Sequence, residues 1–126
     1  MLQNQGPNWN DNRILCQKQG ADLVSIETVK EWNFLNDLIQ KPQSKYNKWM
    51  IGLKKEAGNW TWVSGKPLTI CKWDKNQPSD DGDVAIIVKT SFNDSKVGLF
   101  QVTHGDQPYA SICEITKGKT QHNWVN

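Results

Sequence analysis

Three aspartates lie within four residues of one another, at Asp80, Asp81 and Asp83. Carboxylate oxygens are ligands that calcium prefers, so this cluster, with Gln77 or Asp74, is a candidate cation site. The alternative is a solvated acidic loop that turns at its glycine, and the residues alone favour it. We therefore expect no metal site, and Asp80, Asp81 and Asp83 are the candidate ligands should that expectation fail.

The residues with the chemistry of a nucleophile and its base form no recognisable catalytic pattern. His104 lies in a Thr-His-Gly-Asp stretch, and Cys71 or Ser111 would have to serve as its nucleophile. Such a nucleophile needs a base within hydrogen-bond reach and a third, orienting group. No hydrolase, zinc-protease or phosphate-loop signature occurs. We expect the protein not to be an enzyme, with His104 and His122 on the surface.

The charge pattern excludes two classes of partner. The 126 residues carry 15 Lys+Arg and 13 Asp+Glu, well interspersed, for a formal net charge of +2. The charges form no basic stripe that would bind nucleic acid. No apolar run approaches the ~18 residues of a membrane span. With 37% hydrophobic residues the chain is long enough for one globular domain. We expect this domain at residues 1–116, followed by a polar tail or linker at 117–126.

Three cysteines and two sequons bear on the compartment. An odd number of cysteines means at least one free thiol or an intermolecular bridge. Asn59-Trp60-Thr61 and Asn93-Asp94-Ser95 are N-glycosylation acceptors in a secreted protein. Together they favour an extracellular location, either secreted or in the ectodomain of a membrane protein.

Two helices and several strands can be placed from the residue pattern. Asn8 suits the N-cap of a helix over about 9–19, with Gly20 after it. Thr28–Glu31 forms a capping box, and the apolar residues after it recur at helical spacing up to Ile39. The predicted strands, in chain order, are 3–6, 21–26, 49–53, 60–63, 84–89, 97–102 and 109–115. Residues 64–83 are predicted to be a long irregular loop, and such loops in compact domains are often functional.

Several motifs occur in an order that resembles the C-type lectin-like domain, from Leu2 to Ile115. The motifs are Trp9-Asn10 before Cys16, Gly20–Ile26 (GADLVSI), Trp49–Leu53 (WMIGL), Trp60-Thr61-Trp62, and Cys113-Glu114. The run GLKKEAGNWTWVSGKPLT looks most similar to the selectin and proteoglycan branches. The resemblance implies an α+β fold in which two helices flank small antiparallel sheets, with a long irregular loop.

The resemblance also implies a disulfide pairing. In that family the first and last cysteines are joined, which here implies Cys16–Cys113, a bridge expected to stabilise by about 4–5 kcal/mol. The positions of the family's inner disulfide hold Asp83 and Gly105 instead. Cys71 matches neither bridge, and we expect it to be a buried or half-buried free thiol rather than a paired cysteine.

Sugar binding in the family uses a calcium ion held by the long loop and the following strand. The loop motif is Glu-Pro-Asn or Gln-Pro-Asp, and a Trp-Asn-Asp triplet follows on the strand. Here the matching positions hold Gln77-Pro78-Ser79 and Phe100-Gln101-Val102. Because Val102 has no ligand oxygen and the loop ligands are weaker, we expect no cofactor, with weak or no calcium binding.

The sequence therefore predicts an extracellular recognition module that binds a protein partner without calcium-dependent sugar chelation. The alternative is a carbohydrate-binding lectin with a rearranged calcium site in the long loop, and a glycan is then the partner. The contact face is expected around residues 73–83 and 89–96. Trp73 either contacts a ligand or fastens the loop to the core, and the second reading is favoured. The candidate ligand-binding residues are Trp73, Gln77, Ser79, Asp80, Asp81, Asp83 and Gln101.

Overall fold

The computed structural model describes residues 2–115 and 123–124 of the chain. Two helices, α1 (Trp9–Gln17) and α2 (Val29–Ile39), accompany one sheet. Its strands are β1 (Leu2–Gln5), β2 (Ala21–Leu23), β3 (Lys48–Glu56), β4 (Asn59–Trp62), β5 (Val84–Val88), β6 (Phe100–Thr103), β7 (Ala110–Ile115) and β8 (Asn123–Trp124). The predicted α+β class is therefore confirmed. The predicted boundary between domain and tail stays a prediction, because 116–122 and 125–126 lie outside the described residues.

Both helices begin at the caps that the sequence indicates. The Asn8 side chain accepts the Asp11 backbone N–H at 2.8 Å, and Thr28 Oγ1 accepts that of Glu31 at 3.1 Å. Each cap satisfies a donor that the first helical turn leaves without an intrahelical partner. Helix α1 ends at Gln17, two residues before the predicted end, and Gly20 follows with φ +73°.

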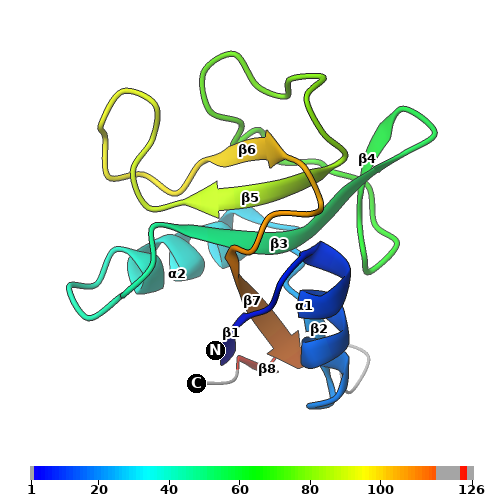
Figure 1. Cartoon of the computed structure of the whole chain (residues 1–126). Helices are drawn as coiled ribbons and strands as arrows, with labels where there is room; N and C mark the ends of the chain where they lie inside the picture. Colours follow the sequence, from blue (N-terminus) through cyan, green and yellow to red (C-terminus); the bar gives the residue numbers. More distant parts are fainter. Residues whose placement is uncertain (1, 116–122, 125–126) are drawn as a thin grey trace.

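The strands join in one mixed sheet rather than in separate antiparallel ones. The order is β1-β7-β3-β5-β6, with β2 and β8 paired to β7 and β4 paired to β3. Strands β3 and β7 run parallel, and the other pairs are antiparallel. In Figure 1, the later part of the loop at residues 64–83 lies on the far side of β5 and β6 from α1 and β7. Strand β6 begins at Phe100, later than the predicted Val97, although the Leu99 carbonyl still accepts the Val88 N–H.

The β3–β4 hairpin is closed by a two-residue turn at Ala57-Gly58. Both residues have positive φ, +49° and +83°, as expected of a type I′ turn, the form that matches the twist of the strands. Gly52 lets β3 lie close to Val63 and to the backbone at Leu23 and Val24. A Cβ there would lie 2.7 Å from Val63 and 2.8 Å from the backbone oxygens of Leu23 and Val24.

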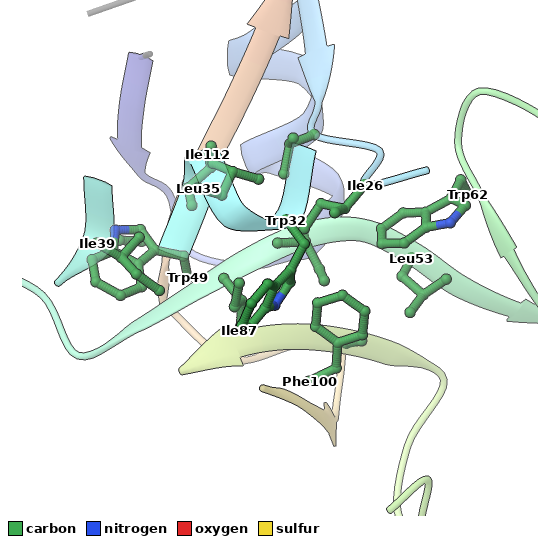
Figure 2. Packing of buried hydrophobic residues seen from close by; sticks show 14 residues of the cluster. Ile26, Trp32, Leu35, Ile39, Trp49, Leu53, Trp62, Ile87, Phe100 and Ile112 are labelled. Carbon is green, nitrogen blue, oxygen red and sulfur yellow. The ribbon is translucent and has the colours of Figure 1, made fainter. Parts of the chain in front are cut away.

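The larger of two apolar clusters lies between α2 and the sheet. Trp49, Trp62 and Phe100 are almost fully buried in it, and the Trp62 and Phe100 rings meet edge to face at 5.9 Å (Figure 2). Such aromatic pairs add about 0.5–1.5 kcal/mol to the burial of their area. Because Phe100 belongs to β6, the core reaches the strand against which the long loop packs.

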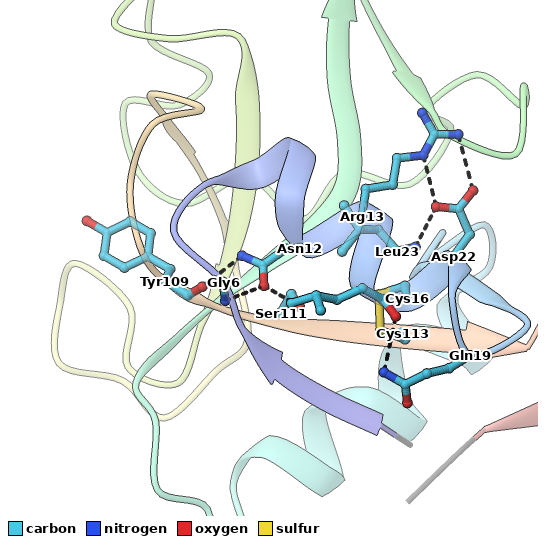
Figure 3. Close-up of a disulfide and its surroundings, with 11 residues drawn as sticks. Gly6, Asn12, Arg13, Cys16, Gln19, Asp22, Leu23, Tyr109, Ser111 and Cys113 are labelled. Atoms are coloured by element: carbon cyan, nitrogen blue, oxygen red, sulfur yellow. Dashed lines mark hydrogen bonds and ion pairs between the residues drawn. A yellow bond between two sulfur atoms is a disulfide. The ribbon is translucent and has the colours of Figure 1, made fainter.

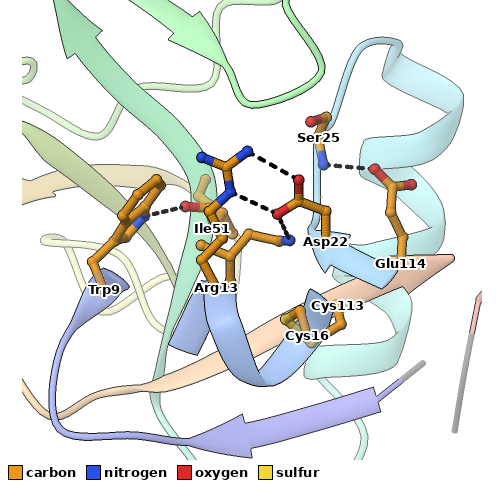
Figure 4. A network of polar contacts seen from close by, with 9 residues as sticks. Trp9, Arg13, Cys16, Asp22, Ser25, Ile51, Cys113 and Glu114 are labelled. Atoms are coloured by element: carbon orange, nitrogen blue, oxygen red, sulfur yellow. Dashed lines mark hydrogen bonds and ion pairs between the residues drawn. A yellow bond between two sulfur atoms is a disulfide. The ribbon is translucent and has the colours of Figure 1, made fainter. Parts of the chain in front are cut away.

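Helix α1 is fastened to β7 by the disulfide that the sequence resemblance implies. Cys16 and Cys113 are bonded, fully buried and 97 residues apart in the chain, with their Cα atoms 5.5 Å apart (Figure 3). Beside this bridge the Arg13 guanidinium bonds the Asp22 carboxylate at 3.0 and 3.2 Å (Figure 4). The disulfide prediction is confirmed. No helix among the described residues is long and apolar enough to cross a membrane.

Candidate functional site

The long loop at residues 64–83 is fastened to the core by aromatic packing. Trp73 forms a bridge with Phe100, and its ring meets those of Trp60 and Phe100 edge to face at 5.2 and 6.0 Å. Leu68 and Ile70 also pack against the core cluster. Trp73 is half-buried, so the arrangement agrees with the favoured reading, in which this side chain holds the loop against the core.

A buried carboxylate joins three segments of the site. Asp74 is only 4% exposed, and its Oδ2 accepts the Phe92 backbone N–H and the Gln101 Nε2, both at 2.8 Å. Its Oδ1 accepts the Lys75 N–H at 2.8 Å. The Asp74 carboxylate thus connects the long loop to β6 and to the loop at 89–96. No described ion pair involves it, so these N–H groups replace the solvation that burial removes.

A second side chain, three residues after Asp74, also fastens the long loop to β6. Gln77 precedes a cis peptide bond to Pro78, and its Oε1 accepts the backbone N–H groups of Val102 at 2.9 Å and Ser79 at 3.2 Å. Ser79 Oγ in turn accepts the Asp81 N–H at 3.4 Å. Two of the predicted residues, Gln77 and Ser79, are thus hydrogen-bonded to each other, and the third, Gln101, binds Asp74. The side-chain oxygen of Gln77 already has two donors.

The three predicted aspartates do not converge. The Asp80 side chain is fully exposed and lies 3.7 Å from Lys55 Nζ, and Asp81 is exposed as well. Asp83 borders a pocket beside the N-terminus of α1. Gly82 between them allows close approach to β6, because a Cβ would overlap the Thr103 carbonyl. Within the described part of the chain, no three His, Cys, Asp or Glu side chains gather as metal ligands.

Comparison with known proteins identifies the family. A model of the C-type lectin domain matches residues 5–115. The chain belongs to the C-type lectin domain family. It is similar to the CD209 antigen of Macaca mulatta, at 36% identity over 105 residues, which cover 78% of this chain and 25% of the relative. It is also similar to C-type lectin domain family 4 member M of Nomascus concolor, at 37% over 87 residues, 65% of this chain and 21% of the relative. The chain thus spans about a quarter of the length of these relatives.

Solved structures confirm the fold. Human lithostathine aligns with a TM-score of 0.73 at 20% identity, covering 88% of both chains. The calcium-independent C-type lectin SPL-2 from Saxidomus purpuratus aligns with a TM-score of 0.77 at 21% identity, covering 94% of this chain and 86% of that one. C-type lectin domains are generally recognition modules rather than enzymes, and no catalytic activity is indicated here.

The calcium-site positions of this C-type lectin domain do not fit the ion. Calcium takes six to eight hard oxygen ligands, usually including several carboxylates. At the matching positions Gln77 Oε1 is bound to two N–H groups, Gln101 presents its Nε2 to Asp74, and Val102 has no side-chain oxygen. A calcium ion there would have to break the bonds that hold the loop to β6.

The positions of the missing inner disulfide face each other. A Cβ built on Gly105 would lie 3.8 Å from Asp83 Oδ1. The two departures from the family pattern therefore occur at one place in the fold. The end of the long loop is held there by backbone bonds, such as the Lys55 N–H to the Asp83 carbonyl at 2.8 Å.

The prediction for Cys71 is correct on pairing and wrong on burial. The thiol is free, and it is exposed. Leu68, Ile70 and Trp73 pack inward on the core cluster, and Cys71 lies between them in an irregular segment. The core is filled by the larger apolar side chains, and the cysteine is left at the surface.

The residues considered for catalysis do not form a site. His104 and Cys71 are exposed, whereas Ser111 is fully buried and its hydroxyl donates to Asn12 Oδ1 at 3.1 Å. His122 lies outside the described residues. Both sequon asparagines, Asn59 and Asn93, are exposed.

Sequence reasoning missed two residues of this site. Asp74 was considered only as a helper in a cation site, and Phe92 was not singled out. Phe92 is 66% exposed, although Asp74 binds its backbone N–H. An aromatic residue in a predicted turn was the available signal for Phe92. Nothing in the sequence marks Asp74 as buried among its exposed acidic neighbours.

Proposed function

We propose that this domain is an extracellular recognition module that binds a protein partner through its long-loop face, without calcium-dependent sugar chelation. The observation that carries the proposal is the use of the Asp74 carboxylate and the Gln77 amide as acceptors for N–H groups of the protein itself. Both side chains fasten the long loop from within. At the positions that the family resemblance assigns to calcium, the Gln77 side-chain oxygen already accepts two N–H groups, and Val102 has no side-chain oxygen to offer.

The surface around these bonds suits a protein partner. Phe92 exposes 66% of its surface, and a well-placed aromatic side chain is a frequent hot spot of protein interfaces. Asp74 accepts the backbone N–H of Phe92 and so holds the backbone of this loop in place. The loop backbone therefore loses little conformational entropy when a partner covers Phe92. Exposed Asp80 and Asp81 in the long loop and exposed Lys96 in the loop at 89–96 give these two loops charges of both signs, as is usual at the polar rim of an interface.

The extracellular location is supported by the chemistry of the chain and by its relatives. The buried Cys16–Cys113 disulfide requires an oxidising compartment for its formation. C-type lectin relatives are typically extracellular proteins or membrane ectodomains.

A glycan partner is the alternative, and the solved neighbours favour it. They include SPL-1 in complex with GlcNAc and murine dendritic cell inhibitory receptor 2 in complex with an N-glycan. On this chain the sugar would contact Gln77, Asp80, Asp81 and Asp83. Sugar binding that is lost in chelator supports a rearranged calcium site. The closer resemblance to selectins and proteoglycans stays a prediction.

We expect Phe92→Ala to weaken binding to the partner by about 30-fold, the loss typical of an interface hot spot. Binding of a partner found in a library of extracellular domains is measured by surface plasmon resonance, once with calcium and once in excess EDTA. Ile14→Ala is the matched control, because Ile14 is 45% exposed but lies on α1. Binding that disappears in EDTA, or that weakens equally in both variants, contradicts the proposal.

A further inference from the structure

A pocket of about 590 Å³ lies at the outer edge of β4. Pockets that hold small ligands have volumes of about 300–1,000 Å³, so this one has room for sugar rings. No charged side chain lines it. The lining residues are Asn59, Trp60, Thr61, Gly65, Pro67 and Leu68.

The strand register shows which side of β4 this pocket borders. Thr61 bridges Pro67 in antiparallel fashion, and the Trp62 N–H bonds the Lys66 carbonyl at 3.0 Å. Successive strand residues point to opposite faces, so Asn59 shares the face of Thr61 and its partner Pro67. By the same alternation Trp60 points to the other face, where its ring packs on Trp73, but part of the residue also lines this pocket. The asparagine amide and the threonine hydroxyl of the sequon thus stand side by side over the pocket.

We propose that Asn59 carries an N-linked glycan and that its first sugars lie in this pocket. In the transfer, the Asn59 amide nitrogen attacks C1 of the first sugar of a lipid-diphosphate-linked oligosaccharide, the donor in the secretory pathway. The N–C1 bond forms as the bond from C1 to the phosphate oxygen breaks. The nitrogen loses one proton, and the lipid diphosphate leaves.

Two observations carry this proposal independently of the partner proposed above. Asn59 is exposed directly after the Ala57-Gly58 turn, so a transferase has access to its amide. The uncharged pocket is lined by the apolar residues Trp60, Pro67 and Leu68 and by the polar residues Asn59 and Thr61, a mixture that suits an amphipathic sugar ring.

The second sequon provides the matched control. Asn93 is exposed too, but it does not line this pocket, and it follows the exposed Phe92 in the loop at 89–96. A glycan on Asn93 would therefore extend into solvent beside the proposed contact face. Loss of the Asn59 glycan should affect the folded domain more than loss of an Asn93 glycan.

The test uses the full chain secreted from mammalian cells, with Asn59→Gln and Asn93→Gln variants. Mass spectrometry of the tryptic peptides gives the occupancy of each sequon. The melting temperature and the hydrogen exchange of residues 65–68 are then measured before and after enzymatic removal of the glycans. We expect Asn59 to be occupied, and its deglycosylation to lower the Tm by about 2–5 °C and to speed exchange in that segment. The Asn59→Gln variant should show neither change on enzyme treatment.

Two outcomes overturn the proposal. One is an Asn59 that leaves the secretory pathway unmodified. The other is an occupied Asn59 whose glycan can be removed with no change in Tm or in the exchange of 65–68, as expected for a glycan that points into solvent. Because deglycosylation is carried out on the folded wild-type chain, neither outcome depends on how a variant folds.

Discussion

Replacing Asp74 with alanine is expected to lower the free energy of unfolding by about 3–5 kcal/mol. The carboxylate is 4% exposed and accepts three N–H donors, those of Lys75, Phe92 and the Gln101 side chain. Hydrogen bonds to a charged group contribute about 1.5–3 kcal/mol each, and their losses add incompletely. Urea unfolding followed by tryptophan fluorescence measures the change. Faster hydrogen exchange at the Phe92 amide would show that the loop at 89–96 has been released.

Asp74→Asn and Asp80→Ala complete this experiment. The asparagine keeps one acceptor oxygen and replaces the other with an NH₂ group. We therefore expect Asp74→Asn to lower the free energy of unfolding by about half as much as Asp74→Ala. Asp80 is fully exposed, and its removal should leave the unfolding midpoint unchanged. If the alanine substitutions at 74 and 80 have equal effects, Asp74 does not hold the loop.

Removal of the Cys16–Cys113 bridge is expected to lower the free energy of unfolding by about 3–5 kcal/mol. The bond closes a 97-residue separation, so it restricts the unfolded chain strongly. Both cysteines are fully buried where α1 meets β7, and the Cys16→Ala/Cys113→Ala double variant also loses packing there. The measurement is urea unfolding of this variant beside the oxidised wild type.

Cys71→Ser is the control for that experiment. Its thiol is free and exposed, so the substitution should not move the unfolding midpoint. A double variant that is as stable as Cys71→Ser would show that α1 is held by packing and hydrogen bonds alone. The bidentate Arg13–Asp22 pair and the bond from Trp9 Nε1 to the Ile51 carbonyl, 2.9 Å long, are the contacts that would then have to suffice.

Local chemistry explains which elements could be predicted from the sequence. The caps at Asn8 and Thr28 bind residues three positions away, so the local sequence is enough to predict them. Helix α2 was found because its apolar residues recur at helical spacing on one buried face. The β3–β4 hairpin is also a local signal, because Gly58-Asn59 lies between segments rich in tryptophan and β-branched residues. The structure places the turn one residue earlier, at Ala57-Gly58, and Asn59 begins β4.

Long-range contacts explain what could not be predicted. Asp74 meets Phe92 and Gln101, which are 18 and 27 residues away, and no local pattern distinguishes this aspartate from exposed Asp80. The parallel pairing of β3 with β7 joins distant segments in the same way. The prediction of a buried or half-buried Cys71 is wrong because larger side chains fill the core space beside it.

The central claim is that the long loop is held in place without calcium. The most direct test is the melting temperature of the oxidised domain in excess calcium and in chelator. A specific site filled to about 100 times its dissociation constant adds about 2.7 kcal/mol, which in a domain of this size raises the Tm by about 10 °C. We predict the same Tm in both solutions, because Asp74 and Gln77 already hold the long loop through N–H donors of the protein. A clear rise in calcium that is abolished by Asp81→Asn or Asp83→Asn would contradict the account and support the rearranged calcium site.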